Sequence, residues 1–427
     1  MKKPLLLSLA CAAMLLSSPV SHAEDIVEFM SGVQATGTVK TIRKTEREFE
    51  FEAKVAGRTL VRTYSFAEVH AVTLNGTRHV LTEMPNQTGG VQSGTGIKRT
   101  QQQVRQLIDT VGSTPPDWYD ETPLKYPDTL NLEWPLKPES KKWNGRVNVG
   151  QHLWDTIYPN TSRWKSGVKL VHQIMATHKN DPELLSRDMR VLGSAYFNLF
   201  QDYPRAAFWL EKTKEMPPVE GKIPLAECYW RLGNDEMALA LMRGRDLPLQ
   251  AIKLLGDMGQ TDRAVALAKR YTNSSWKHMA LLMGGDACRS AGRYDDAVKL
   301  YEMVLAAGNA RNKEYTDRFR GRARDSIQAI RLLKKARVEL VADGTYRDNS
   351  IGYNGPIEVE LTVQSGKITD AQVVKHKEKQ FYAALTDTPN QILEKQSVQG
   401  IDGTSGATIT SVAIVNAAAK ALASGAK

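Results

Sequence analysis

A turn recurs four times in the middle of the chain, and each recurrence ends one helical pattern and begins another. The turn positions are residues 201, 233, 259 and 292, which are separated by 32, 26 and 33 residues. Each turn is a glycine or a short polar stretch, and an alanine follows it four or five residues later. Since a single helix pair cannot bury its apolar face, such a repeat predicts stacked helix pairs over residues 151–333.

The segments before three of these turns share small and aromatic positions. They are Leu192–Tyr196, Leu225–Tyr229 and Gly285–Cys288. This pattern resembles tetratricopeptide repeats, whose period is about 34 residues, with one shortened member and no complete consensus. The resemblance implies a concave surface that docks a protein partner, with a rigid spacer as the alternative. The arginine-rich last helix, Arg311 to Arg331, favours a solvated capping face or an anionic partner.

Residues 1–23 have the pattern of a signal peptide. Lys2 and Lys3 precede the apolar run Leu5–Leu16, and Ser21-His22-Ala23 supplies the small residues that a signal peptidase requires. We expect cleavage after Ala23 and a periplasmic or otherwise exported mature chain. A lipoprotein signal at Cys11 fits less well, because Ser8 lies where that signal requires Leu or Val. No later run approaches the roughly 18 apolar residues of a membrane span, so no transmembrane segment is expected in the mature chain.

Residues 24–82 have the alternating pattern of short strands, for example around Phe49 and Phe51. Four or five strands and the hairpin signal Asn75-Gly76 predict a small β-barrel-like module that resembles SH3 or Sm domains. His70 and His79 are expected to be ordinary strand residues, since no Cys or carboxylate completes a metal set. Residues 83–150 are rich in Gly, Pro and Trp and predict a linker, either a strap packed on the helices or a partner-docking segment.

Composition excludes several classes of protein. The 427 residues are 41% hydrophobic and 24% charged, which excludes a wholly disordered or fibrous chain. Of the formal charge of +10, two units come from Lys2 and Lys3, and the remainder does not indicate a nucleic-acid partner. Cys228 and Cys288 lack metal or haem spacing and predict buried thiols, with one long-range disulfide as the alternative. No hydrolase or nuclease motif is present, so we assign no catalytic residue and no metal ligand.

From residue 335 the pattern changes to strands and short helices. Ile357–Val363 and Ile368–Val374 alternate as a strand pair, and helical pieces follow around Phe381–Leu385 and Pro389–Gln396. The stretch Asp402–Ser411 then leads into an alanine-rich helix. The sequence as a whole predicts a multidomain α+β chain: the β-module, the TPR-like helical solenoid and an α+β domain over residues 335–427.

The start of the last helix is suited to an anion. Gly406 and Ala407 leave the Thr408 hydroxyl uncovered, and free N–H groups and the helix dipole favour negative charge there. A phosphate joined to that hydroxyl would keep one negative charge at this position. The alternative is a plain helix N-terminus with Thr or Ser as its cap.

The run Asp402-x-x-Ser405-Gly406-Ala407-Thr408 resembles the flavinylation signature D-x-x-[ST]-G-A-T of FMN-binding domains. These domains occur in the C subunit of sodium-pumping NADH:quinone oxidoreductase and in the G subunit of Rnf complexes. Four further landmarks of that domain are present, at Asp343–Tyr346, Gly355-Pro356, Ser365–Ile368 and His376–Glu378.

The resemblance implies an FMN joined through its phosphate to Thr408 by a flavin transferase that uses FAD. It implies recognition or phosphate-loop roles for Asp402, Ser405, Gly406 and Ala407, and phosphate contacts for Thr410 and Ser411. Thr404 and Thr410 are the rival acceptors, and His376 and Glu378 have no role that the sequence defines.

The resemblance also implies a function. No dinucleotide fingerprint, haem motif or iron–sulfur cysteine cluster accompanies the domain. We therefore expect an exported flavoprotein that carries electrons between a membrane or periplasmic donor and an acceptor, with the TPR-like repeats docking a protein partner. The alternative is a periplasmic scaffold or sensor whose FMN-binding domain is regulatory or unoccupied.

Overall fold

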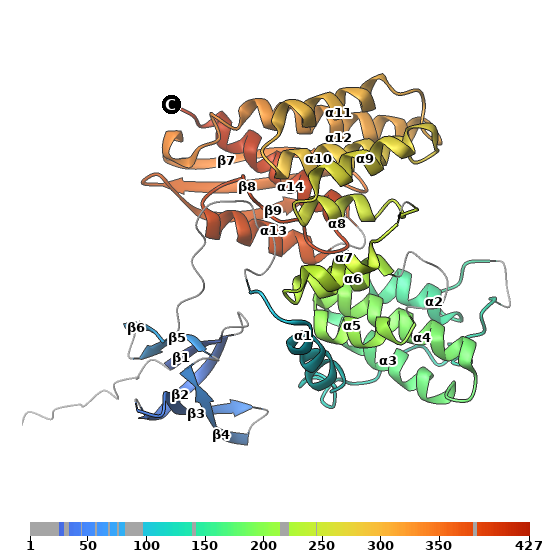
Figure 1. The fold of residues 1–427 in the computed structure, drawn as a ribbon, viewed down its shortest axis with the longest axis vertical. Helices are drawn as coiled ribbons and strands as arrows, with labels where there is room; N and C mark the ends of the chain where they lie inside the picture. Colours follow the sequence, from blue (N-terminus) through green and yellow to red (C-terminus); the bar gives the residue numbers. More distant parts are fainter. Residues whose placement is uncertain are drawn as a thin grey trace, which may run out of the picture. The chain divides into compact units, whose positions relative to one another are not determined.

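The computed structural model describes residues 25–29, 34–43, 45–55, 58–66, 69–74, 77–81, 97–138, 142–213, 222–244, 246–378 and 382–427. The chain divides into two compact units, Met1–Thr88 and Gly89–Lys427 (Figure 1). The predicted signal peptide and the Asn75-Gly76 turn lie outside the described residues. Within the described ranges, no helix has the length and apolar character needed to cross a membrane.

The first unit is an antiparallel sheet. Its strands are β1 (Asp25–Phe29), β2 (Gln34–Arg43), β3 (Glu48–Val55), β4 (Arg58–Ser65), β5 (Val69–Leu74) and β6 (Thr77–Val80), in the spatial order β4-β3-β2-β1-β5-β6. Val27, Phe49, Phe51, Val69 and Val72 form its core. The predicted strand content is confirmed, and β1 adds a strand between β2 and β5 that the alternation did not reveal. No pairing joins β4 to β6 in the described residues, and the barrel stays a prediction.

The middle of the second unit consists of helices that contact one another in chain order. They are α3 (Trp164–Thr177), α4 (Pro182–Ala195), η5 (Tyr196–Phe200), α5 (Tyr203–Glu211), α6 (Lys222–Arg231), α7 (Asp235–Leu241), α8 (Ala251–Asp257), α9 (Thr261–Arg270), α10 (Lys277–Ser290), α11 (Tyr294–Ala306) and α12 (Lys313–Leu332). Most neighbours in this order pack directly on each other. The predicted helical middle of the chain is confirmed, whereas its assignment to tetratricopeptide repeats stays a prediction.

The four predicted turns share one backbone conformation. Gln201, Gly233, Gly259 and Gly292 all have left-handed φ angles, of 51°, 94°, 71° and 71°. Glycine adopts this conformation without the steric cost that a side chain imposes, which explains its use at three of the four positions. The alanines five residues later are Ala206, Ala238, Ala264 and Ala297, and each is 0% exposed. The short side chain lets the second helix of each pair approach the first.

The described part of the predicted linker, residues 97–138 and 142–150, packs on the helices and is here called the strap. It contains α1 (Gln101–Leu107), η2 (Ile108–Gly112) and α2 (Val149–His152). The ring of Trp118 stacks on Phe200 with a centroid separation of 5.4 Å, and the Arg187 guanidinium lies 3.6 Å from the Trp134 ring centroid. Lys169 Nζ donates hydrogen bonds to three strap carbonyls. These contacts fix the strap on α3, α4 and η5.

The C-terminal domain is a three-stranded antiparallel sheet with two helices. Its elements are β7 (Gly344–Ile351), β8 (Pro356–Gln364), β9 (Lys367–Lys375), α13 (Tyr382–Lys395) and α14 (Thr408–Ser424), with strand order β7-β8-β9. The predicted strands and last helix are confirmed. The two predicted helical pieces are instead one helix, α13, which continues through Pro389.

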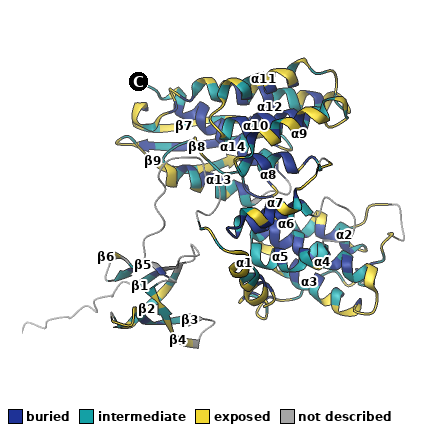
Figure 2. Ribbon diagram, viewed as in Figure 1, coloured by how far each residue is buried: buried dark blue, intermediate teal, exposed yellow. Residues whose placement is uncertain are grey.

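The alanine-rich helix α14 is buried over most of its length (Figure 2). It packs on β7 and β8, and also on α12 and α13. Ala329 and Leu333, from α12 and the residue after it, belong to the same hydrophobic core as the sheet. The C-terminal domain and the helices therefore share a core rather than meeting through a linker.

The arginine-rich helix α12 supports this junction. Arg322 is only 8% exposed, and its guanidinium donates hydrogen bonds to the carbonyls of Gly352 and Tyr353 at 2.8 to 3.1 Å. Burial lowers the pKa of Arg322 to about 10. At this position α12 binds the C-terminal domain, so the expected solvated or partner-binding face does not include Arg322. Cys228 and Cys288 are buried free thiols, as predicted.

Candidate functional site

The segment Asp402–Ala407, here called the signature loop, leads directly into α14. Thr408 is the first residue of α14, is half-buried, and borders two cavities. The N-cap residue Ala407 provides no side-chain hydrogen bond to the first turn. Without a side-chain cap, the first-turn N–H groups favour an anion at Thr408.

The two rival acceptor threonines are buried and already bonded. Thr404 is 2% exposed, and its hydroxyl donates to Asp387 Oδ2 at 2.5 Å. Thr410 is 0% exposed, and its hydroxyl donates to Glu378 Oε2 at 2.7 Å. Among these three threonines, Thr408 alone is accessible enough to bear a large substituent.

Ser411 and Glu378 have structural contacts. Ser411 Oγ accepts hydrogen bonds from the Thr404 N–H at 3.0 Å and from the Thr388 hydroxyl at 3.1 Å, which fixes the loop on α14 and α13. Glu378 Oε1 accepts from the Asn354 N–H at 2.9 Å. Glu378 therefore ties the turn after β7 to α14, while His376 is exposed. The phosphate contacts that we expect from Thr410 and Ser411 stay predictions.

The helices hold the signature loop from the opposite side. The Ser405 hydroxyl donates to Glu227 Oε1 of α6, and its oxygen lies 3.1 Å from the Tyr203 hydroxyl of α5. Gly406 has a φ of 73°, and a Cβ atom there would lie 2.1 Å from Asn198 Oδ1 of η5. Glycine at this position therefore meets two requirements, a left-handed backbone and close approach to η5.

Asp402 is fixed by a buried cation. Its carboxylate forms an ion pair with Arg231 of α6, whose Nη2 also donates to the Gly403 carbonyl at 3.2 Å. Burial by itself would lower the pKa of Arg231, but Asp402, Tyr203 and Glu227 together hold it well above its ordinary value. Asp402 Oδ1 is buried and has no hydrogen-bond partner among the described residues.

A second cation completes this cluster. Lys253 of α8 pairs with Asp257, lies 3.5 Å from Glu227 Oε1 and donates to the Gly403 carbonyl at 3.4 Å. With Arg231 and Asp402, the cluster contains two cations and three carboxylates. Burial, reinforced by the other carboxylates, raises the pKa of Asp257 to about 7 despite Lys253.

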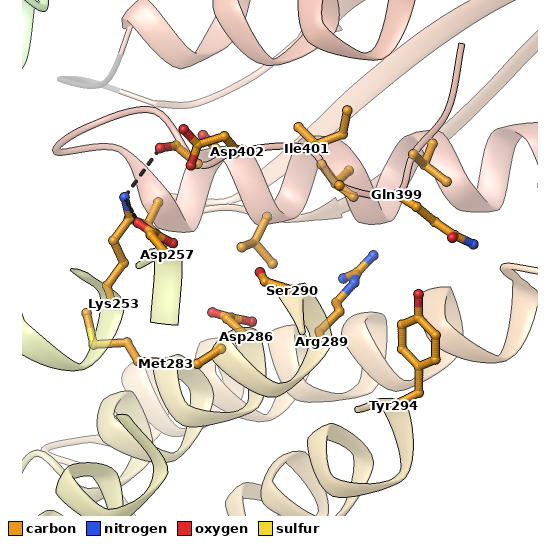
Figure 3. A pocket seen from close by; sticks show the side chains of 18 of the residues that line it. Lys253, Asp257, Met283, Asp286, Arg289, Ser290, Tyr294, Gln399, Ile401 and Asp402 are labelled. Atoms are coloured by element: carbon orange, nitrogen blue, oxygen red, sulfur yellow. Dashed lines mark hydrogen bonds and ion pairs between the residues drawn. The ribbon is translucent and has the colours of Figure 1, made fainter. Parts of the chain in front are cut away.

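A cavity of about 90 Å³ opens beside Thr408, between α10 and the loop (Figure 3). Asp286 and Arg289 project toward it from α10. Arg289 Nη1 donates to Asn416 Oδ1, whereas its buried Nη2 has no partner among the described residues. Asp286 accepts a 2.7 Å hydrogen bond from the Tyr301 hydroxyl, and burial raises the pKa of Asp286 to about 6.

The residues present fit a phosphate-linked flavin. Thr408 offers a hydroxyl at an uncapped helix start, and the adjoining cavity has one orphaned donor, Arg289 Nη2, and one orphaned acceptor, Asp402 Oδ1. Buried polar atoms are rarely left without partners in proteins, so two at one cavity point to a polar ligand.

Sequence reasoning missed the part of the site that comes from the helices. Glu227 lies between Ala226 and Cys228, and Asp286 lies between Gly285 and Ala287. A carboxylate that interrupts a run of small or apolar residues on a buried helix is a signal for such a position, because buried charges require partners. Arg231 and Arg289 give no comparable signal, since arginine is common on exposed helix faces.

Comparison with known proteins identifies the C-terminal region. Residues 352–423 match the family model of the FMN-binding domain. No curated protein and no solved structure matches the chain. The match includes the signature loop, Thr408 and most of α14. It excludes η5, α5, α6 and α8, which hold the loop, and α10, which lines the cavity. The C-terminal region of this chain therefore carries the sequence of an FMN-binding domain.

Proposed function

We propose that this chain is an exported flavoprotein that carries FMN in phosphoester linkage on Thr408 and passes electrons between partner proteins. The observation that carries the proposal is the position of Thr408, at the uncapped start of α14 and beside a cavity lined by both cationic and carboxylate side chains. The match of residues 352–423 to the FMN-binding domain supports the choice of cofactor.

The attachment step needs FAD and a flavin transferase. Thr408 Oγ would form a bond to the phosphorus of the FMN half of FAD, the anhydride bond between the two phosphates would break, and AMP would leave. The hydroxyl proton would pass to a base of the transferase. The resulting phosphodiester keeps one negative charge, which the first-turn N–H groups of α14 stabilise.

The chain's own residues would position the attached group. The Arg231–Asp402 ion pair and the Ser405 contacts hold the loop in one conformation. When bound, FMN supplies one- and two-electron chemistry, and the protein supplies orientation and electrostatics. In this proposal the signal peptide directs export, and the helix pairs dock a redox partner that is either membrane-bound or soluble.

Intact mass of the mature chain, co-expressed with a flavin transferase, tests the proposal. We expect one FMN-phosphoryl increment in the wild type and none in Thr408→Val. Thr410→Val is the matched control and should keep the increment, because its hydroxyl is buried against Glu378. Reversible reduction and reoxidation of the bound flavin would support electron transfer. No increment, with an active transferase shown on a positive control, would overturn the proposal and favour the scaffold alternative.

A further inference from the structure

The wall that faces Thr408 comes from outside the FMN-binding domain match. Two cavities border Thr408, and α10 contributes Met283 and Asp286 to both of them. α10 lies more than 60 positions before residue 352, where the match begins. The site around Thr408 is therefore built jointly by the C-terminal domain and the helices.

The larger cavity combines an apolar lining with polar groups. Its apolar side includes Met283, Ala287, Leu333, Val412 and Val415, and its polar groups include Asp286, Arg289 and Gln399. This combination suits a ligand that is flat, largely apolar and polar at one edge, since small-molecule sites are mostly apolar with a few placed polar groups.

Arg289 is the best-placed of these polar groups. Asn416 holds one of its terminal nitrogens, which fixes the guanidinium, and the other nitrogen is buried without a partner among the described residues. The residue projects from α10 into the space between α10 and the loop that bears Gln399 and Ile401 (Figure 3). A fixed guanidinium with an N–H that has no partner can donate a hydrogen bond to a carbonyl oxygen or a ring nitrogen that gains negative charge.

We propose that this cavity receives the isoalloxazine ring of the flavin attached at Thr408, and that Arg289 contacts the ring. The inference rests on the proposed function. The tether at Thr408 keeps the ring close to the cavity and so raises its effective concentration there. The cavity of about 90 Å³ is smaller than the roughly 300–1,000 Å³ of pockets that enclose small ligands, so only part of the ring enters.

Two measurable consequences follow. A ring that is partly covered by α10 is less accessible to solutes such as iodide than a ring in water. A cation beside the ring stabilises the negative charge that reduction adds, and therefore raises the reduction potential.

The experiment uses the full mature chain, flavinylated and verified by intact mass. Its variants are Arg289→Met, Arg289→Lys and the matched control Arg293→Met, which removes an exposed arginine four residues further along. We expect Arg289→Met to show a several-fold larger iodide quenching constant for flavin fluorescence and a more negative midpoint potential. Arg289→Lys should restore most of the potential, because it keeps the charge, and Arg293→Met should match the wild type.

Met283→Trp is a second variant that leaves all charges in place. It fills the cavity from another position on α10, so it should also raise iodide quenching by displacing the ring. A flavinylated Arg289→Met or Met283→Trp protein that matches the wild type in quenching and potential would overturn this inference and leave the proposed function intact. A wild type without attached FMN would instead overturn the proposed function and this inference together.

Discussion

The turns at Gly233 and Gly292 arise from the same sequence pattern but have different surroundings. Both glycines are left-handed, and in both turns the next residue's N–H bonds to a carbonyl five positions earlier. At Gly233 the strap covers the turn, since the Arg99 N–H donates to the Gly233 carbonyl at 2.9 Å. At Gly292 a Cβ atom would meet nothing within 4 Å.

The arginines beside the two turns differ in the same way. The Arg231 side chain is 10% exposed and pairs with Asp402 of the signature loop. The Arg293 side chain is 40% exposed and pairs with Asp262 and Asp296. The repeat pattern therefore determines the local conformation of each turn. Distant parts of the chain determine how much each turn residue contributes to stability.

The largest expected difference is between Arg231→Met and Arg293→Met. Removing Arg231 leaves the buried Asp402 without its ion-pair partner and Glu227 with Lys253 alone, and breaking a buried pair in this way costs about 3–5 kcal/mol. Removing Arg293 breaks only exposed ion pairs, so we expect little change in the free energy of unfolding. Urea unfolding followed by tryptophan fluorescence checks both variants. Equal midpoints would show that the cluster around Asp402 does not stabilise the fold.

A smaller difference should separate Gly233→Ala from Gly292→Ala. Both impose a left-handed alanine, at a cost of about 1–2 kcal/mol. Alanine at 233 also places its Cβ 2.1 Å from the Ile97 carbonyl oxygen, which adds about 1–3 kcal/mol through overpacking. Hydrogen exchange of the Arg99 amide provides an independent readout, because the strap should detach in Gly233→Ala alone. Unchanged protection of that amide in Gly233→Ala would contradict the close contact.

A pH-dependent effect concerns Asp286, for which no ion pair is found among the described residues. Its pKa is about 6 in the folded chain and 3.8 ordinarily, so the folded chain binds more protons between these values. The contribution of Asp286 to the free energy of unfolding therefore falls as pH rises from about 4 to 6. Above pH 6 this contribution no longer changes. Asp286→Asn keeps the acceptor for Tyr301, and its free energy of unfolding should exceed that of the wild type by up to about 3 kcal/mol at pH 7.

Unfolding of flavin-free Asp286→Asn and wild type at several pH values checks this expectation. The difference between the two proteins should grow from pH 4 to 6 and then stay level. A difference that is the same at pH 4 and at pH 7 would mean that Asp286 titrates normally.

Local features of the fold were predictable from the sequence. The four turns and the buried alanines follow from glycine conformation and helix periodicity, and the β8–β9 hairpin follows from strict alternation around Ser365-Gly366. These signals are carried by residues a few positions apart. Pro389 is a misleading signal in the sequence, because a proline usually interrupts a helix, yet α13 continues through it.

The candidate site was only half predictable. Thr408 and the loop form a contiguous motif, so a resemblance could identify them. The groups that hold the loop lie far away in sequence: Glu227 is 178 positions before Ser405, and Arg231 is 171 positions before Asp402. No local pattern encodes such pairs. They depend on how the helices pack against the C-terminal domain, which the assumption of separate domains did not anticipate.

The contacts of Ser405 have a consequence for the timing of assembly. Ser405 is 1% exposed, with its hydroxyl bonded to Glu227 and close to Tyr203. On the proposed function, a transferase that reads this loop must first displace both helices from it. Modification would then compete with closure of the helices during maturation, and the relative rates of these two events would set the fraction of chains that carry a flavin.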